Sequence, residues 1–276
     1  DLRQFIEEHK EKLSQADIEK SFAKLYEFVQ EKKKYLASDP TMIAPGYEPQ
    51  LSLNFHFIDV TYVPTDELLR LKREEEIRNR VNSLDMPKDI RKASIRSFEV
   101  TSGRSEALEA SLDFINQYES SPKMFHKALY LVGDFGVGKT YLLGAVAHEL
   151  AVKGFETTLL HFPTFAGEMK QAISNDRVGP KLDEVKRAPI LMIDDIGADS
   201  MSAWIRDEVL GVILQHRMQE QLPTFFSSNF NMDQLEEHLS VTQRGDEEPL
   251  KAKRIMERVR YLSKEIWVIG ENRRNG

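Results

Sequence analysis

The segment Gly133-Asp-Phe-Gly-Val-Gly-Lys-Thr140 constrains this chain more than any other stretch, because it follows the G-x-x-x-x-G-K-T pattern. It comes directly after an apolar run of strand length, residues 128–132, and before a helical pattern over 141–151. Glycines let the backbone turn its amide groups toward phosphate oxygens, and the following helix adds the partial positive charge of its N-terminus. The sequence therefore predicts a strand, a phosphate-binding loop and a helix of an α/β fold.

The loop predicts binding of ATP with Mg²⁺. Lys139 is expected to bridge the β and γ phosphates, and Thr140 is expected to place its hydroxyl on the magnesium ion. A glycine-rich turn without a ligand is the alternative, but the strand before the loop and the helix after it favour a nucleotide site. The residues expected to contact the nucleotide are Gly133, Asp134, Phe135, Gly136, Val137, Gly138, Lys139, Thr140 and Tyr141.

Four further apolar runs of strand length alternate with longer helical patterns. They cover residues 157–162, 190–193, 224–228 and 266–269. Strands that are buried on both faces by crossover helices are typical of a parallel sheet, and the ligand of such a sheet binds at the carboxyl ends of the strands. We therefore expect a doubly wound, five-stranded parallel α/β sheet.

Two of these strands end in polar residues that suit phosphate chemistry. Asp194 and Asp195 follow the run 190–193, and Asn229 follows the run 224–228. We expect Asp194 to hold hydrated Mg²⁺, Asp195 to act as general base on water, and Asn229 to sense the γ-phosphate. Alone, either feature is also compatible with a turn at a strand end, where Asn is common.

A basic helix over residues 251–260 precedes the last strand, and Arg273 and Arg274 follow that strand. Such a helix is commonly a solvated face. In an oligomeric ATPase, however, a neighbouring subunit supplies an arginine that stabilises the charge of the transition state. Arg258 is the candidate for that role in trans.

The N-terminal third has a different character. Apolar residues recur at helical spacing over 2–34, which predicts two amphipathic helices, and Pro-rich alternating segments over 35–65 predict a small hairpin. A charged helix over 66–82 follows and is broken at 85–87. We place the domain boundary between about Leu84 and Ser97. The expected organisation is an N-terminal domain over 1–90, a linker over 91–97 and an ATPase domain over 98–276.

Composition excludes several classes of site. The 276 residues contain no cysteine, which rules out disulfides, thiolate zinc sites and cysteine nucleophiles. A formal charge of −7 gives no global electrostatic footprint for nucleic acid, so DNA contact would need a local basic patch. With no apolar run of membrane-spanning length and no leader pattern, a cytoplasmic location is expected.

The P-loop, the Asp194-Asp195 pair, Asn229 and the late arginines together resemble an AAA+ ATPase over residues 98–276. A narrower resemblance, to the DnaC/DnaI family of bacterial primosomal helicase loaders, rests on specific stretches. These are the P-loop itself, Leu191-Met-Ile-Asp-Asp-Ile-Gly-Ala, Trp204-Ile-Arg-Asp-Glu-Val, Leu214-Gln-His-Arg-Met, Leu222-Pro-Thr-Phe-Phe-Ser-Ser-Asn-Phe and Gly270-Glu-Asn-Arg-Arg-Asn.

The resemblance implies an ATP-dependent loader that places the replicative hexameric DNA helicase on single-stranded DNA in replication initiation or restart. It implies that the N-terminal domain binds the helicase and that the AAA+ domains self-associate. Such AAA+ cores lack a full helical lid, in agreement with the short tail 271–276. An arginine of that tail would act as the second nucleotide sensor, and of Arg273 and Arg274 the latter is preferred.

Residues 163–187 are expected to form two helices where a minimal AAA+ core carries one, and the resemblance links this insertion to DNA and to filament-like assembly. Lys170 is then a candidate phosphate contact. Ser202 and Trp204 are candidates for an inner surface on which a base stacks. Burial of Trp204 in the core or in an interface is the alternative.

Two departures from the family pattern matter. Its members commonly carry a cysteine-based zinc site in the N-terminal domain, but residues 34–41 hold no cysteine, so we predict no zinc. The region 35–62 must then fold by its own packing or on binding the helicase. In addition, Asp195 stands where many AAA+ proteins have Glu. Asp is one methylene shorter than Glu, which predicts slow hydrolysis, suited to a switch that responds to DNA or a partner.

Two other functions remain as alternatives. A transposase-accessory AAA+ ATPase, which regulates the choice of target DNA, shares the lid-poor core and differs mainly in its N-terminal partner domain. A small-molecule kinase also uses a P-loop, but no phosphoacceptor site is evident. The apolar stripe of the first helices, 5–29, is explained either by binding a partner or by burial in its own domain.

Overall fold

The computed structural model describes residues 2–84, 86, 90, 92–173 and 177–273. The chain forms two compact units, which divide between Glu76 and Ile77. This division lies before the segment 91–97 that the sequence suggested as a linker. The reason is a short strand, β3 (Val81–Leu84), which pairs with the sheet of the second unit and so draws its neighbours into that unit.

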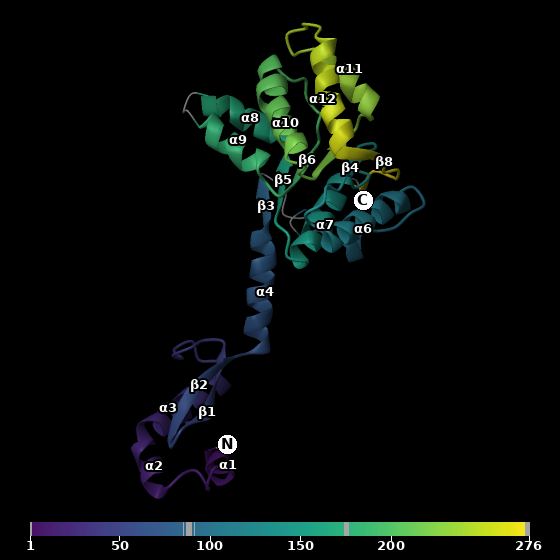
Figure 1. Cartoon of the computed structure of the whole chain (residues 1–276). Helices are drawn as coiled ribbons and strands as arrows, with labels where there is room; N and C mark the ends of the chain where they lie inside the picture. Colours follow the sequence, from purple (N-terminus) through teal and green to yellow (C-terminus); the bar gives the residue numbers. More distant parts are fainter. Residues whose placement is uncertain (1, 85, 87–89, 91, 174–176, 274–276) are drawn as a thin grey trace. The chain divides into compact units, whose positions relative to one another are not determined.

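The first unit is built on helices and one antiparallel hairpin (Figure 1). Three helices precede the hairpin where the sequence suggested two, because Ser14 caps a separate short helix and buried Ser21 ends it. The Ser21 hydroxyl accepts a hydrogen bond from Ile58 N–H at 3.0 Å and so joins that turn to the hairpin. The elements are α1 (Leu2–Glu8), α2 (Gln15–Lys20), α3 (Phe22–Leu36), β1 (Tyr47–Asn54) and β2 (Phe57–Pro64). Helix α4 (Asp66–Arg80) begins in this unit and continues past the division at Glu76.

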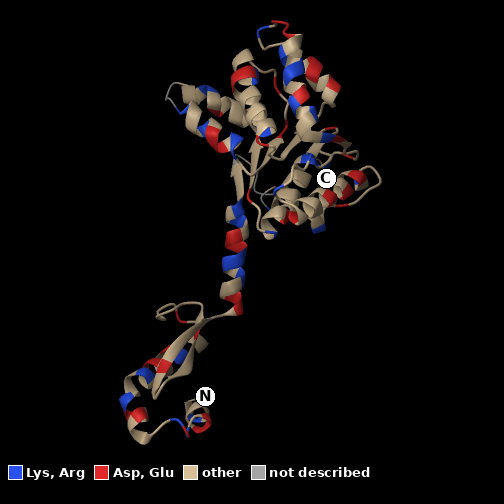
Figure 2. Cartoon of the chain, viewed as in Figure 1, with Lys and Arg blue, Asp and Glu red and all other residues tan. Residues whose placement is uncertain are grey.

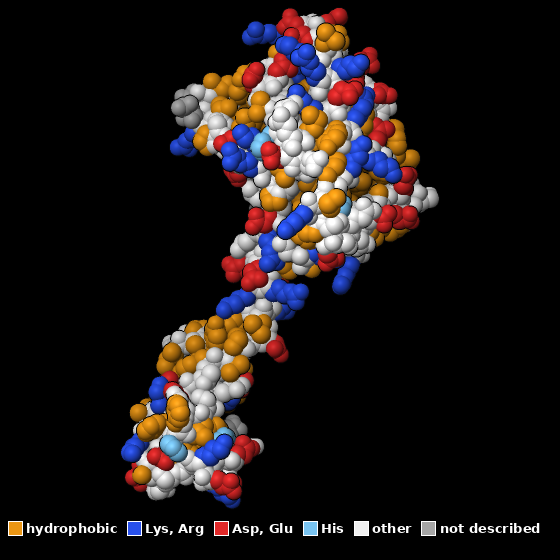
Figure 3. Space-filling view, in the orientation of Figure 1, with side chains coloured by type: hydrophobic (Ala, Val, Ile, Leu, Met, Phe, Trp, Pro, Cys, Tyr) orange, Lys and Arg blue, Asp and Glu red, His pale blue; other side chains and the backbone are white. Residues whose placement is uncertain are grey.

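Only some side chains of the predicted apolar stripe are buried inside this unit. Leu25 and Phe28 are buried, whereas Phe22 and Tyr26 on the same helix are exposed. Hydrophobic side chains are visible on the surface of this unit in Figure 3. Helix α4, in contrast, buries no residue, and it alternates acidic and basic side chains along its length (Figure 2).

Polar contacts organise the cysteine-free stretch after α3. The Glu31 carboxylate is almost fully buried and accepts hydrogen bonds at 2.7 Å from both Ile43 N–H and Lys34 Nζ. A turn in which Asp39 accepts from the backbone and hydroxyl of Thr41 closes the loop. The hydrogen bond from Lys34 and that from Ile43 lower the pKa of Glu31. The loop is therefore held to α3 by an ionised side chain.

The second unit contains a six-stranded parallel sheet in the order β3-β5-β6-β7-β4-β8. Four strands occupy the predicted runs, whereas β8 begins three residues before the predicted run 266–269 and ends at Trp267; the doubly wound parallel fold is confirmed. The sixth, β3, was missed because an edge strand need not be a continuous apolar run, and Asn82 and Ser83 interrupt this one. The others are β4 (Ala128–Val132), β5 (Thr157–His161), β6 (Ile190–Asp194), β7 (Thr224–Ser228) and β8 (Ser263–Trp267).

Helices cover both faces of this sheet, and β4 shows the pattern in its alternating side chains. Leu129 and Leu131 pack into one apolar cluster with α6 (Ser105–Ser120) and α7 (Lys139–Val152). Tyr130 and Val132 pack into the other cluster. That second face is covered by α8 (Phe162–Ala172), η3 (Ile205–Leu210), α10 (Gly211–Gln219), α11 (Met232–Ser240) and α12 (Pro249–Leu262).

Two details of the connections bear on function. The segment between β5 and β6 forms two helices, α8 and α9 (Val178–Lys186), as the sequence predicts. Strand β4 lies between β7 and β8, which come later in the chain. The carboxyl end of β4 is therefore flanked by the ends of two strands from distant parts of the sequence, where ligands of such sheets bind.

Candidate nucleotide-binding site

The P-loop joins β4 to α7, as predicted, and its glycines have specific structural reasons. Gly136 and Gly138 adopt φ angles of +77° and +101°, in the left-handed region that side chains disfavour. At Gly133 a Cβ would lie 2.1 Å from the carbonyl oxygen of Val268, so a side chain there would displace the backbone that follows β8. Val137 is buried in an apolar cluster of the core and so anchors the loop to it.

Lys139 lies inside the loop and is 7% exposed. Its Nζ donates hydrogen bonds of 2.8 Å to the carbonyl oxygens of Gly133 and Asp134. A third 2.8 Å hydrogen bond joins it to the amide oxygen of Asn229, which follows β7. The neighbouring strands β4 and β7 thus bring the predicted phosphate-binding lysine and the predicted sensor into direct contact.

Thr140 and Asp194 also meet. The Thr140 hydroxyl lies 2.9 and 3.1 Å from the two carboxylate oxygens of Asp194, and Ser227 donates to the same carboxylate at 2.5 Å. Burial raises the pKa of Asp194, and the negative charge of Asp195 adds to the shift. Mg²⁺ prefers oxygen ligands of this kind, and a cation there would offset the cost of burying the carboxylate. These residues therefore fit a magnesium site.

Asp195 occupies a left-handed backbone conformation, with φ of +60°. Its N–H donates to the Ser227 hydroxyl at 3.0 Å, and its carboxylate is partly exposed and lies 3.8 Å from Nε2 of His161. Proximity to this carboxylate raises the pKa of His161. Sequence reasoning missed His161, although it is a polar residue near the end of the predicted strand 157–162, which is the signal that could have identified it. In the structure it ends β5 and pairs in register with Asp194 of β6.

A cavity of about 620 Å³ gathers most of the predicted residues. Phe135, Gly136, Gly138, Lys139, Thr140, Tyr141, Asp194, Asp195 and Asn229 line it. Residues that the sequence analysis did not single out line the rest, among them Met86, Phe98, Glu99, Arg104 and His161. Three of the predicted contacts, Gly133, Asp134 and Val137, do not line the cavity. The carbonyl oxygens of Gly133 and Asp134 instead accept hydrogen bonds from Lys139.

The C-terminal tail reaches the same cavity. Arg273 donates its backbone N–H to Gly136 O at 3.1 Å, lines the cavity, and forms an ion pair with Glu99. The hydrogen bond from Arg273 lowers the pKa of Glu99. Arg274, which the sequence analysis preferred as second sensor, lies outside the described residues.

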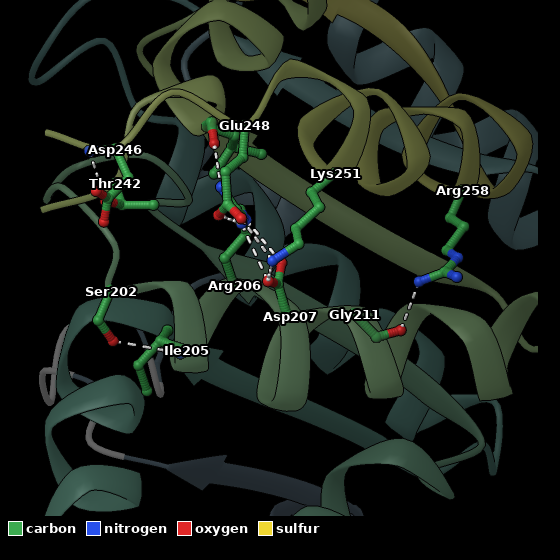
Figure 4. A network of polar contacts seen from close by, with 11 residues as sticks. Ser202, Ile205, Arg206, Asp207, Gly211, Thr242, Asp246, Glu248, Lys251 and Arg258 are labelled. Atoms are coloured by element: carbon green, nitrogen blue, oxygen red, sulfur yellow. Dashed lines mark hydrogen bonds and ion pairs between the residues drawn. The ribbon is translucent and has the colours of Figure 1, made fainter. Parts of the chain in front are cut away.

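Arg258 is not in the lining of this cavity. It extends from α12 and donates to the carbonyl oxygen of Gly211 at 2.9 Å, where the π-helical segment η3 meets α10 (Figure 4). Its position within a single chain is therefore separate from the P-loop.

The three candidates for DNA contact separate into two groups. Lys170 and Ser202 line a second hollow of about 230 Å³, which Asp195 also borders. Trp204 packs half-buried against the core instead. The Ser202 hydroxyl accepts a hydrogen bond from Ile205 N–H at 3.3 Å (Figure 4).

Sequence reasoning also missed the buried Arg206, although it lies within one of the stretches that carry the family resemblance. Arg206 is 1% exposed and pairs with Asp207 and Glu248, while Lys251 bridges the same two carboxylates (Figure 4). These contacts tie η3 to the start of α12, the helix that carries Arg258.

Comparison with known proteins finds a matching family model for each part of the chain. Residues 1–62 match the family model described as "Primosomal protein DnaI N-terminus", and residues 50–275 match the one described as "IstB-like ATP binding protein". The chain is 40% identical over 280 residues to the replicative helicase loader DnaI of Bacillus subtilis strain 168. That match covers 100% of this chain and 89% of the relative.

Solved structures agree with these matches. A crystal structure of DnaI is 43% identical, with a TM-score of 0.63, and covers 72% of this chain and 99% of its own. The crystal structure of the DnaC helicase loader, 19% identical with a TM-score of 0.56, covers 66% of this chain and 100% of its own and shows a shared fold. Among the described residues, no helix is both long and apolar enough to cross a bilayer.

Proposed function

Because the chain belongs to the DnaI family of replicative helicase loaders and carries that family's ATP-binding domain, we propose that it loads a replicative helicase in an ATP-dependent manner. The observation that carries this proposal is the match to a curated helicase loader over the whole chain. That match includes the N-terminal segment, in which P-loop proteins of other functions differ.

Each residue of the site has a separate role in ATP hydrolysis. Lys139 binds the phosphates, and Asn229, in contact with Lys139, responds to the presence of the γ-phosphate. Thr140 and Asp194 would hold Mg²⁺, which neutralises charge on the phosphates. Asp195 orients and deprotonates the attacking water, and His161 faces its carboxylate. The short Asp195 side chain makes turnover slow.

The two units divide the interactions with partners. The N-terminal unit binds the helicase, and the exposed Phe22, Tyr26 and Phe55 support this because large apolar side chains at a surface commonly mark an interface. Lys170 and Ser202 contact single-stranded DNA in the hollow beside Asp195. The ATPase units self-associate so that Arg258 of one subunit reaches the nucleotide of the next.

The tail provides the second nucleotide sensor. Of the two adjacent arginines, Arg273 is supported by its position in the lining of the cavity and by its hydrogen bond to the P-loop. Its ion pair with Glu99 leaves the guanidinium exchangeable for a phosphate, because both side chains are partly exposed.

A transposase-accessory ATPase is not favoured. The IstB-like model covers residues 50–275, which are mainly the ATPase unit, whereas residues 1–62 match the DnaI N-terminus. A small-molecule kinase also finds no support in the matched families.

The test combines the full chain with the replicative helicase of the same organism and measures loading onto single-stranded DNA with and without ATP. We expect co-purification with the helicase and ATP-dependent loading. Lys139→Ala should retain the helicase but lose ATP-dependent loading, because it removes a phosphate contact. Failure of the wild-type chain to bind the helicase at low salt, or coating of duplex DNA in its place, would overturn the proposal.

A further inference from the structure

One charged side chain in the wall of the nucleotide cavity has no role in the site as described above. Arg104 precedes α6, is 2% exposed, and lines the same cavity as Lys139. The centre of its guanidinium lies 3.9 Å from the centroid of the Phe98 ring. Stacking on an aromatic ring fixes the plane of a guanidinium and leaves its edge free to donate hydrogen bonds.

The hydrogen bonds of Arg104 are incomplete within the described part of the chain. Nη1 donates to the carbonyl oxygen of Glu99 at 2.8 Å. Nε is buried and has no hydrogen-bond partner among the described residues. Buried N–H groups are nearly always paired in folded proteins, so the contacts within the described residues do not use the full hydrogen-bonding capacity of this guanidinium.

The position of the guanidinium identifies where that acceptor would lie. A Cβ placed on Gly138 would lie 2.6 Å from Nη2 of Arg104, so the guanidinium packs directly against the P-loop. The backbone amides of this loop are the groups that cradle phosphates. Arg104 therefore lies next to the P-loop, the part of the cavity that is expected to bind phosphate.

The charge balance points to the same conclusion. Two arginines, Arg104 and Arg273, face one carboxylate, that of Glu99, and Glu99 pairs directly with Arg273. Burial lowers the pKa of Arg104, and the positive charge of Arg273 lowers it further. A buried cation without a paired carboxylate is costly, and an anionic ligand removes that cost.

We propose that Arg104 is a nucleotide-binding residue that donates hydrogen bonds to a phosphate group of the bound nucleotide. The inference rests on the proposed function, because it concerns the ligand of the same cavity. It assigns the phosphates a cation that comes from the segment before α6, in addition to Lys139 of the P-loop. Arg104 then favours charged adenine nucleotides over the uncharged nucleoside.

The test uses the full chain with Arg104→Gln, which removes the charge and keeps a shorter, uncharged side chain that can still donate a hydrogen bond. Affinities for ATP, ADP, AMP and adenosine are measured by competition against a fluorescent ATP analogue. We expect at least tenfold weaker binding of ATP and ADP, with adenosine changed less than twofold. Arg96→Gln, an exposed arginine eight positions earlier, makes the same charge change and should leave all four affinities unaltered.

Two further measurements separate contact from architecture. Arg104→Lys keeps the charge and should recover part of the ATP affinity, and it replaces Arg104→Gln if that variant does not fold. The melting temperature without nucleotide reports any purely structural effect. Equal losses for all four ligands, or no loss of ATP affinity, would overturn the proposal. If the wild-type chain binds no ATP, the proposed function fails instead, which is a distinguishable result.

Discussion

At the scale of single residues, the site depends on polar atoms that neighbouring strands bring within hydrogen-bond distance. The Lys139 to Asn229 contact and the Thr140 to Asp194 contact each join two segments that are far apart in sequence. Asp195 differs from these because its carboxylate is partly exposed and points to the cavity that the phosphates would share. That exposure suits a group that must reach water.

Asp195→Asn tests the role of this residue as general base. Asparagine has nearly the same size but does not accept a proton, so ATP turnover should fall by about 100-fold or more while ATP affinity stays within about threefold. Single-turnover hydrolysis and equilibrium ATP binding measure the two quantities separately. Turnover equal to that of the wild type would remove Asp195 from the catalytic role.

At the scale of elements, buried polar side chains hold loops and strand ends where apolar packing alone does not. Arg217 on α10 is fully buried, and burial lowers its pKa to about 9. It donates to the carbonyl oxygens of Ala188 and Pro223 at 2.7 and 2.6 Å and to the Thr224 hydroxyl at 2.7 Å. One side chain thus ties α10 to the beginnings of β6 and β7.

Arg217→Ala should destabilise the ATPase unit by about 3 kcal/mol or more, because it leaves buried carbonyl groups unpaired and opens a cavity. The free energy of unfolding in urea measures the effect. Arg217→Lys should also destabilise, since an ammonium cannot reach three separate acceptors with the same geometry. The control is the exposed Arg244→Ala, which should change stability by less than about 0.5 kcal/mol.

The loop after α3 should open in acid, because Glu31 holds it through its ionised form. The pKa of Glu31 is lowered in the folded state, so its stabilising contribution is present above the unfolded value of 4.5 and is lost as pH falls through the lower folded value. Hydrogen exchange at Ile43 N–H, corrected for intrinsic rates, should accelerate below about pH 4.5. Glu31→Gln should show fast exchange already at pH 7, and protection that is unchanged in the variant would contradict this account.

At the scale of the whole molecule, Arg258 is the residue whose proposed role depends on a second copy of the chain. Arg258 contacts Gly211 and is not in the lining of the nucleotide cavity, so a role in hydrolysis requires a second copy. The helix that carries it is tied to η3 by the buried Arg206 network. Helix α12 and strand β6, which ends just before Asp195, also pack into the same apolar cluster.

Mixing two inactive variants tests this arrangement. Arg258→Ala keeps an intact site but lacks the trans arginine, and Asp195→Asn keeps Arg258 but lacks the base. Each alone should hydrolyse ATP slowly, whereas an equimolar mixture should recover turnover, because Asp195→Asn subunits supply Arg258 to the intact sites of their neighbours. ATP affinity of Arg258→Ala at low protein concentration should stay near the wild-type value. No recovery in the mixture would argue that Arg258 acts within its own chain or is structural.

Local features were predictable from the sequence. The P-loop and the strand that leads to Asp194 are each a continuous stretch of sequence. Their glycines, apolar runs and carboxylates can therefore be interpreted from a few neighbouring residues. The five buried strands follow from the same logic. The edge strand β3 escaped prediction because polar residues interrupt it, and α2 escaped because single residues, Ser14 and Ser21, separate it from the helices on either side.

The composition of the cavity wall was decided by the tertiary structure. Glu99 and Arg104 come from the segment before α6, His161 from the end of β5 and Arg273 from the tail after β8, and none has a local pattern that marks it as a binding residue. They converge because the parallel sheet places the ends of β4, β5 and β8 at one edge, the tail folds back onto Gly136, and Ile269 N–H of the same tail donates to Gly103 O in the segment before α6. The sequence by itself determined that this protein binds a nucleotide, since a P-loop is a local property of the backbone. Which charges surround the phosphates is a long-range property, and only the packing of distant segments decides it.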